Sequence, residues 1–225
     1  MDRRQLIKSL TALSALSLIP GTNLLGINSL KKLHIIGLGT AGTNIAVRLK
    51  QHGIVGKYTC ITRFPSFIEP IQVANFINGF FHIEYDYRLE FATNYELGKE
   101  KQPKLLTIEM QERLSDHCFY IILVGLGGWT GTSLIQSTLE FLTSTNKQYL
   151  AICQLPFEFD GEFRTNFALA KQAEIEKYKG VYFLDHHDFQ NRSNIQMLSE
   201  LFSAADEEIV SFVKAKLPKS IKVKI

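Results

Sequence analysis

The chain has 225 residues, 45% of them hydrophobic and 21% charged, which excludes a disordered or fibrous protein and suits one domain of ordinary size. Its formal net charge is +3, but five lysines lie in the last twelve residues, and without them the charge is −2. Because a nucleic-acid-binding domain needs a basic face, the composition argues against nucleic acid as a partner.

The first 30 residues are expected to form an extension outside the folded domain. Arg3 and Arg4 precede a short apolar run from Ser9 to Pro20, a pattern that resembles a bacterial twin-arginine export signal. The run is too short to span a membrane, and no clear small-x-small cleavage site follows it. An extension without any signal function explains the pattern equally well. We therefore expect a cytoplasmic protein, with twin-arginine export as the alternative and membrane contact only through the termini.

From residue 32 onward, short apolar runs alternate with helical patterns. Strands are expected at 33–36, 58–62, 118–124, 148–154 and 180–184, helices at 41–51, 105–115, 132–144, 162–178 and 192–217, and short strands and loops at 64–103. This alternation predicts an α/β fold, a three-layer, Rossmann-like parallel sheet with helices on both faces. The domain is expected to span residues 31–217, followed by a basic tail or edge strand at 218–225.

The first predicted strand ends in a glycine loop, in which Gly37, Gly39 and Gly42 form Gly-x-Gly-x-x-Gly before a helix. Glycines let the backbone approach a phosphate closely, and a helix N-terminus offers free N–H groups and a partial positive charge. A dinucleotide site usually has an acid after the second strand, but this chain has Arg63, which suits a 2′-phosphate. This loop alone leaves open a nucleotide site, an NADP-dependent oxidoreductase and a structural turn.

A second glycine-rich loop, Gly125 to Ser133, follows the strand at 118–124 and also opens a helix. Two such turns at one sheet edge predict a facing pair of anion cradles, whereas an ordinary dinucleotide fold uses one. The run Gly-x-Gly-Gly-x-Thr-Gly-Thr resembles the phosphate-loop signature of the tubulin/FtsZ family of guanine-nucleotide-binding proteins. Other segments are similar to further family motifs: the first loop ending in Asn44, Pro156 to Arg164, and Phe202-x-x-x-Asp206. The resemblance covers residues 32–217.

The resemblance implies a binding module that holds GTP or GDP, with Mg²⁺ as an additional ligand, and it implies no catalytic or metal-ligating residue. The two loops would hold the phosphates, and Asp160 and Arg164 the ribose side. Phe202 would stack on the base, while the carboxylate of Asp206 would accept from the two adjacent donors of guanine, which adenine lacks. The implied nucleotide-binding residues are Gly37, Gly39, Thr40, Gly42, Asn44, Gly125, Gly127, Gly128, Thr130, Gly131, Thr132, Asp160, Arg164, Phe202 and Asp206.

Several positions depart from the family pattern. Trp129 replaces a third glycine of the phosphate loop, so its indole is expected to narrow the cradle or to turn outward. The base-contacting Asn of the family falls near His186 or His187, which we expect to be partly exposed in a strand-end loop, with a base contact as the alternative. Arg63 stands near the family's metal-side acid, and a looser match, Ala92 to Gly98, resembles the loop that senses the terminal phosphate.

The chain ends before the family's second domain and water-activating loop. Because a general base contributes about 10²- to 10⁴-fold to such reactions, we expect nucleotide binding with weak or no intrinsic hydrolysis. A protein partner would supply the missing half of the longitudinal contact. The two alternatives are an NADP-dependent oxidoreductase and a ligand-free scaffold of the same fold.

Overall fold

The computed structural model describes residues 32–62, 79–82, 108–115, 118–186, 189–190, 195 and 197–217. The predicted N-terminal extension (1–30), most of the predicted loop region at 64–103 and the predicted C-terminal tail (218–225) lie outside these residues. Within the described part of the chain, no helix combines the length and apolar character that crossing a membrane requires.

The described strands and helices alternate along the chain, as the apolar runs predict. In chain order they are β1 (Lys32–Leu38), α2 (Gly39–Gln51), β2 (Lys57–Thr62), β3 (Gly79–His82), α5 (Ile108–Arg113), β4 (Cys118–Gly125), α6 (Trp129–Ser144), β5 (Gln148–Leu155), the 3₁₀ turn η4 (Glu158–Asp160), α7 (Glu162–Ile175), β6 (Val181–Asp185) and α9 (Leu198–Lys216). The predicted bounds differ from these by a few residues. The largest difference is at α9, which begins six residues later than predicted.

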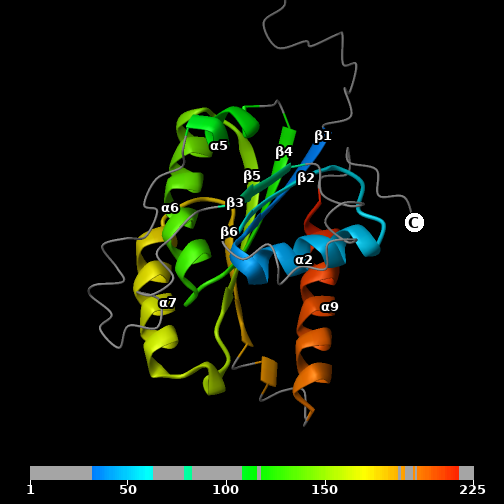
Figure 1. Ribbon diagram of the computed structural model, residues 1–225, viewed down its shortest axis with the longest axis vertical. Coiled ribbons are helices and arrows are strands. Elements are labelled where there is room, and N and C mark those ends of the chain that lie inside the picture. Colours follow the sequence, from blue (N-terminus) through cyan, green and yellow to red (C-terminus); the bar gives the residue numbers. More distant parts are fainter. Residues whose placement is uncertain are drawn as a thin grey trace, which may run out of the picture.

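The strands form one parallel sheet in the order β3-β2-β1-β4-β5-β6 (Figure 1). From β1 the chain proceeds to one side of the sheet and from β4 to the other, so the strand order reverses between them. Leu38 at the end of β1 pairs with Val124 of β4, and Gly125 of β4 pairs with Gln154 of β5. Their carboxyl ends therefore share one edge at a topological switch point, where open α/β sheets bind ligands.

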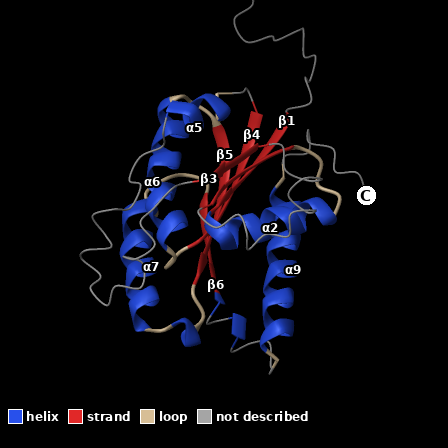
Figure 2. Ribbon diagram, viewed as in Figure 1, coloured by secondary structure: helices blue, strands red, loops and turns tan. Residues whose placement is uncertain are grey.

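Helices cover both faces of the sheet (Figures 1 and 2). On one face α5, α6 and α7 pack on a core that includes Ile122 and Leu134. On the other face α2 and α9 pack on a core that includes Ile35 and Ile209. β1 and β4 are buried on both faces, which explains their near-continuous apolar runs. The predicted three-layer α/β fold is thus confirmed.

Candidate functional site

A cavity of about 680 Å³ opens at the carboxyl edge of the sheet, a volume typical of sites for small molecules and cofactors. The segments that follow β1, β4, β5 and β6 line it, together with α9. The predicted site residues that line this cavity are Gly39, Thr40, Asn44, Gly125, Gly128, Thr130, Gly131, Asp160, Arg164, Phe202 and Asp206. The fold therefore brings together residues that are up to 167 positions apart in the chain.

The other predicted residues, Gly37, Gly42, Gly127 and Thr132, shape the loops and do not line the cavity. A Cβ on Gly42 would collide with the carbonyl oxygen of Leu123, so this glycine lets α2 pack directly on β4. Gly127 has a φ of +89°, and its N–H donates to Oγ1 of Thr132 at 2.9 Å. The Thr132 hydroxyl, predicted to contact phosphate, accepts this bond within the second glycine loop.

Two helix N-termini meet at one end of the cavity. α2 begins at Gly39 and α6 at Trp129, and neither helix has a side-chain cap or an acidic residue in its first turn. A Cβ on Gly39 would lie 3.1 Å from the backbone nitrogen of Gly131, so the two first turns approach each other closely. Free N–H groups and two partial positive charges at this end favour an anion.

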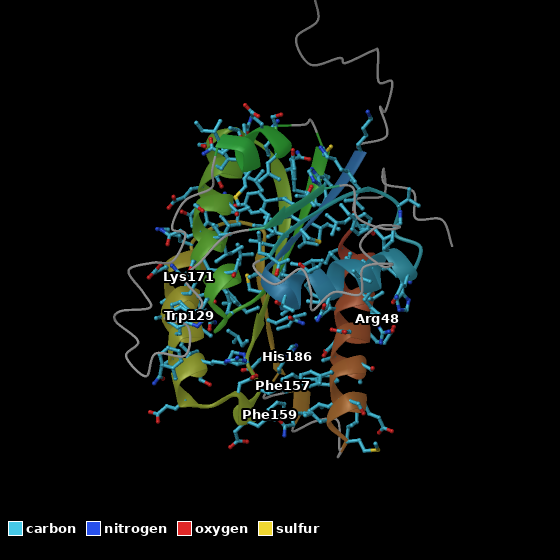
Figure 3. All side chains as sticks on the ribbon, viewed as in Figure 1. Arg48, Trp129, Phe157, Phe159, Lys171 and His186 are labelled. Carbon is cyan, nitrogen blue, oxygen red and sulfur yellow. The ribbon has the colours of Figure 1, made fainter. Side chains whose placement is uncertain are left out.

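The indole of Trp129 packs toward α7 and leaves the cavity open. Its ring centre lies 6.0 Å from that of Phe163 and 5.9 Å from that of Phe167, both in tilted orientations. Figure 3 shows Trp129 on the side of the molecule formed by α6 and α7. Of the two expected outcomes, the structure therefore shows the indole turned away from the cradle, where it forms a side wall of the cavity.

Asp160 and Arg164, the residues implied for the ribose side, bind each other. Oδ2 of Asp160 accepts a hydrogen bond from the Phe157 N–H at 2.9 Å, and its Oδ1 accepts one from Nη1 of Arg164 at 3.2 Å. The guanidinium is exposed, whereas the carboxylate is partly buried. Asp160 therefore caps the turn that joins β5 to α7, a role that the sequence did not indicate.

Aromatic rings line the opposite end of the cavity. Phe157 is buried and stacks on His186 at 4.3 Å and on Phe159 at 5.0 Å between ring centres, while Phe202 meets it edge-on at 5.2 Å. Figure 3 shows Phe157, Phe159 and His186 gathered beside α9. The Phe202 side chain is 44% exposed, so it remains accessible to a flat ring.

The expectation of a partly exposed histidine is wrong for His186, which is only 9% exposed. It lies just after β6 and lines the cavity, because Phe157 and α9 close over it. Burial lowers the pKa of its imidazole to about 4, although Asp160, Asp185 and Glu208 all act to raise it. Its position directly after an apolar strand was the sequence signal that it belongs to this edge. His187, Arg63 and residues 92–98 lie outside the described residues.

Asp206 of α9 lies at the same end of the cavity as Phe202. Burial raises the pKa of its carboxyl group, the nearby charge of Arg48 lowers it, and Glu207 raises it. Arg48 and His52 of α2 both contact Oε1 of Glu207, at 3.5 and 2.8 Å. These contacts tie α9 to α2.

The described acids that line the cavity do not form a metal-binding cluster. Among the described residues, no group of three or more histidine, cysteine, aspartate or glutamate side chains has metal-binding geometry. The described acids that line the cavity are Asp160 and Asp206, and neither comes from the glycine loops. Magnesium commonly binds through substrate phosphates and keeps several waters. These residues therefore fit an ion carried by ligand phosphates, and not one held by the protein alone.

Comparisons with known proteins agree with this arrangement, although no protein-family model matches the chain. The cell division protein FtsZ 1 of Methanocaldococcus jannaschii is 26% identical over 187 residues, which are 81% of this chain and 50% of that protein. The chain spans about half the length of the curated relatives that it matches.

Solved structures share the fold. An empty FtsZ dimer of M. jannaschii matches with a TM-score of 0.61 and 20% identity, over 92% of this chain and 57% of that one. A GDP-bound monomer of CetZ1 from Haloferax volcanii matches with a TM-score of 0.57 and 16% identity, over 84% and 62% of the two chains. At these identities, the two structures establish a common architecture only.

Proposed function

The chain carries a tubulin/FtsZ-family domain over about 80% of its length, and on this premise we propose that it binds a guanine nucleotide, GTP or GDP, in the cavity described above. The observation that carries the proposal is the polarity of the cavity. One end has two uncapped helix N-termini, and the other has exposed Phe202 beside the carboxylate of Asp206.

The phosphates would lie between the first turns of α2 and α6. Gly128 has no atom closer than 4.0 Å to an added Cβ, so its backbone is open to a ligand. Thr40, Thr130 and Gly131 line the same end. Backbone N–H groups at two helix starts neutralise a diphosphate or triphosphate without any lysine, and neither first turn carries an acid that would repel it.

The base would lie at the other end, against Phe202 and Asp206. Guanine presents N1–H and an exocyclic amine side by side, and an ionised carboxylate accepts from both. Adenine has no such pair of donors on that edge. Burial raises the pKa of Asp206, and the Arg48 charge opposes this rise by favouring the ionised form that would accept both guanine donors.

We propose further that the chain by itself hydrolyses GTP weakly or not at all. Hydrolysis needs a group that activates water near the terminal phosphate. The described acids of the cavity, Asp160 of η4 and Asp206 of α9, do not belong to the two glycine loops, and Asp160 already accepts two hydrogen bonds from the chain. Steady release of phosphate from GTP by the purified chain would overturn this part of the proposal.

A protein partner at the mouth of the cavity is a second proposal. Phe159, Met197, Leu198 and Phe202 are 44–59% exposed around the start of α9, and Phe159 lies edge-on to Phe202 at 6.1 Å. One of the similar structures is a dimer. Analytical ultracentrifugation with GTP should therefore show an association that Phe159→Ser weakens; a monomer at all concentrations would contradict this proposal.

Nucleotide binding is tested best with the single tryptophan, Trp129, which lines the cavity. We would titrate the full chain with GTP, GDP, ATP and NADP, follow tryptophan fluorescence and confirm each response by calorimetry. Trp129→Phe serves as the control, since it should lose the optical signal and keep the heat of binding.

A saturable response to GTP and GDP, with ATP inert, would support the proposal. A response to NADP alone would favour the oxidoreductase alternative. No binding by either method would indicate a scaffold that retains the fold without its ligand.

A further inference from the structure

His186, which lines the cavity, has a buried ring nitrogen without a hydrogen-bond partner in the described part of the chain. The Nε2 atom of His186 is buried and has no hydrogen-bond partner among the described residues. The ring stacks on Phe157 with centres 4.3 Å apart and lines the cavity. Buried polar atoms without a partner are rare in folded proteins, and each one costs about 1–3 kcal/mol. Such an atom at the wall of a cavity marks a place where a ligand supplies the missing bond.

We infer that Nε2 of His186 donates a hydrogen bond to the bound guanine nucleotide, and that nucleotide binding is thereby coupled to the uptake of a proton by this imidazole. The inference rests on the proposed function. If Asp206 accepts from N1–H and from one N–H of the exocyclic amine, the guanine atoms that have not yet bonded are the acceptors N3, O6 and N7. A bond to one of these atoms requires His186 to be the donor, with a proton on Nε2.

The charges around the ring determine the direction of the coupling. Asp160 of η4, Asp185 of β6 and Glu208 of α9 all favour the imidazolium. Burial opposes them and prevails without ligand, which lowers the pKa to about 4 and leaves the ring neutral at pH 7. Two further charged groups line the cavity: Asp206 of α9 and Arg164 of α7, and the latter is paired with Asp160.

A ligand acceptor at Nε2 shifts this balance. Hydrogen bonds from a charged donor are stronger than those from a neutral one, so the bound nucleotide favours the imidazolium. The additional proton comes from solvent and binds Nδ1, and no other bond changes. The pKa of His186 is then higher in the complex than in the free protein, and affinity rises as the pH falls between these two values. Protonation of Asp206 has the opposite effect, because it removes the acceptor of the guanine donors.

Calorimetry of the full chain with GDP measures the coupling directly. Titrations between pH 5 and 8, each in two buffers with different ionisation enthalpies, give the number of protons taken up. We expect an uptake of about half a proton near pH 6, which corresponds to an affinity that rises about threefold per pH unit. His186→Asn retains a donor that cannot take up a proton, so it should bind GDP without proton uptake. His52→Asn changes a histidine outside the cavity and should behave like the wild type.

The outcomes separate the two proposals. If the wild type does not bind GDP at any pH, the proposed function fails and this inference fails with it. GDP binding without proton uptake, or with the same uptake in His186→Asn, would leave the proposed function intact and overturn the role of His186. His186→Gln is the second variant if His186→Asn does not fold, and the same loss of uptake is expected of it.

Discussion

Nη1 of Arg164 lies 3.2 Å from Oδ1 of Asp160, four positions earlier in the chain, while the other oxygen of the same carboxylate accepts from the Phe157 N–H. Phe157 in turn carries the stacked ring of His186. The carboxylate implied for the ribose side therefore also holds the aromatic end of the cavity. This double role predicts that substitutions at Asp160 affect stability as well as binding.

Asp160→Ala should destabilise the domain by about 1 kcal/mol, as expected for the loss of a capping side chain, and should also weaken GDP binding. Asp160→Asn keeps an acceptor for the Phe157 N–H and should unfold close to the wild type. The exposed ion pair with Arg164 contributes at most about 0.5 kcal/mol, so Arg164→Gln should change stability little. Urea unfolding measures the free energy of unfolding of the three variants. If Arg164→Gln proved as destabilising as Asp160→Ala, the hydrogen bond from the Phe157 N–H to Asp160 would not be the main source of this stability.

Trp129→Gly should lower stability without improving nucleotide binding. The indole packs on Phe163 and Phe167, and removing a half-buried aromatic ring costs about 2 kcal/mol. Trp129→Phe retains most of the packing, so its loss of stability should be less than half of the loss in Trp129→Gly. Thermal unfolding with and without GDP measures both the stability of each variant and its binding of GDP. If Trp129→Gly bound GDP and the wild type did not, the site would be a degenerated one, as in the scaffold alternative.

Local patterns predicted most of the fold. The apolar runs at β1 and β4 are long and uninterrupted because both strands are covered on two faces, so periodicity and length together identified them. The two glycine loops could be found because their spacing follows from backbone needs that are local to a strand-turn-helix unit. α6 begins at Trp129, three residues earlier than predicted, because part of its glycine loop forms the first helical turn.

Roles that depend on distant residues could not be predicted. Nothing near Gly42 in the sequence indicates that the Leu123 carbonyl lies against it, so its role in packing could not be predicted. The burial of His186 depends on Phe157, which precedes it by 29 positions. Likewise, the pairing of Asp160 with the Phe157 N–H is a feature of the folded turn. The composition and the spacing of motifs contain no information about such contacts.

Two neighbouring glycines should separate ligand contact from folding. A Cβ on Gly128 would meet no atom closer than 4.0 Å, whereas one on Gly131 would lie 2.7 Å from Cγ2 of Val124 and 3.0 Å from the Leu38 carbonyl oxygen. Gly131→Ala should therefore lower the melting temperature markedly. Gly128→Ala should fold like the wild type and bind GDP about tenfold more weakly, because its methyl group lies where the phosphates approach. Equal GDP affinity in Gly128→Ala and the wild type would place the phosphates elsewhere.

Asp206→Asn should stabilise the ligand-free protein and weaken its binding of guanine nucleotides. Burial raises the pKa of Asp206 in the folded state, so its ionised form is unfavourable there, and the stability that its protonation contributes at low pH is lost as the pH rises. A neutral amide removes this cost, so the melting temperature of the ligand-free protein should rise at pH 7. Guanine nucleotides should bind about 10- to 100-fold more weakly, because the amide cannot accept from both donors.

The same variant should gain affinity for xanthosine diphosphate, because the amide N–H donates to the carbonyl that replaces the exocyclic amine of guanine. In the wild type, GDP affinity should fall once the pH is low enough to protonate Asp206. Glu200→Gln is the matched control, since this exposed acid in the first turn of α9 does not line the cavity. Calorimetry with both nucleotides tests the exchange. If Asp206→Asn weakened the binding of GDP and of xanthosine diphosphate alike, Asp206 would support the helix and would not recognise the base.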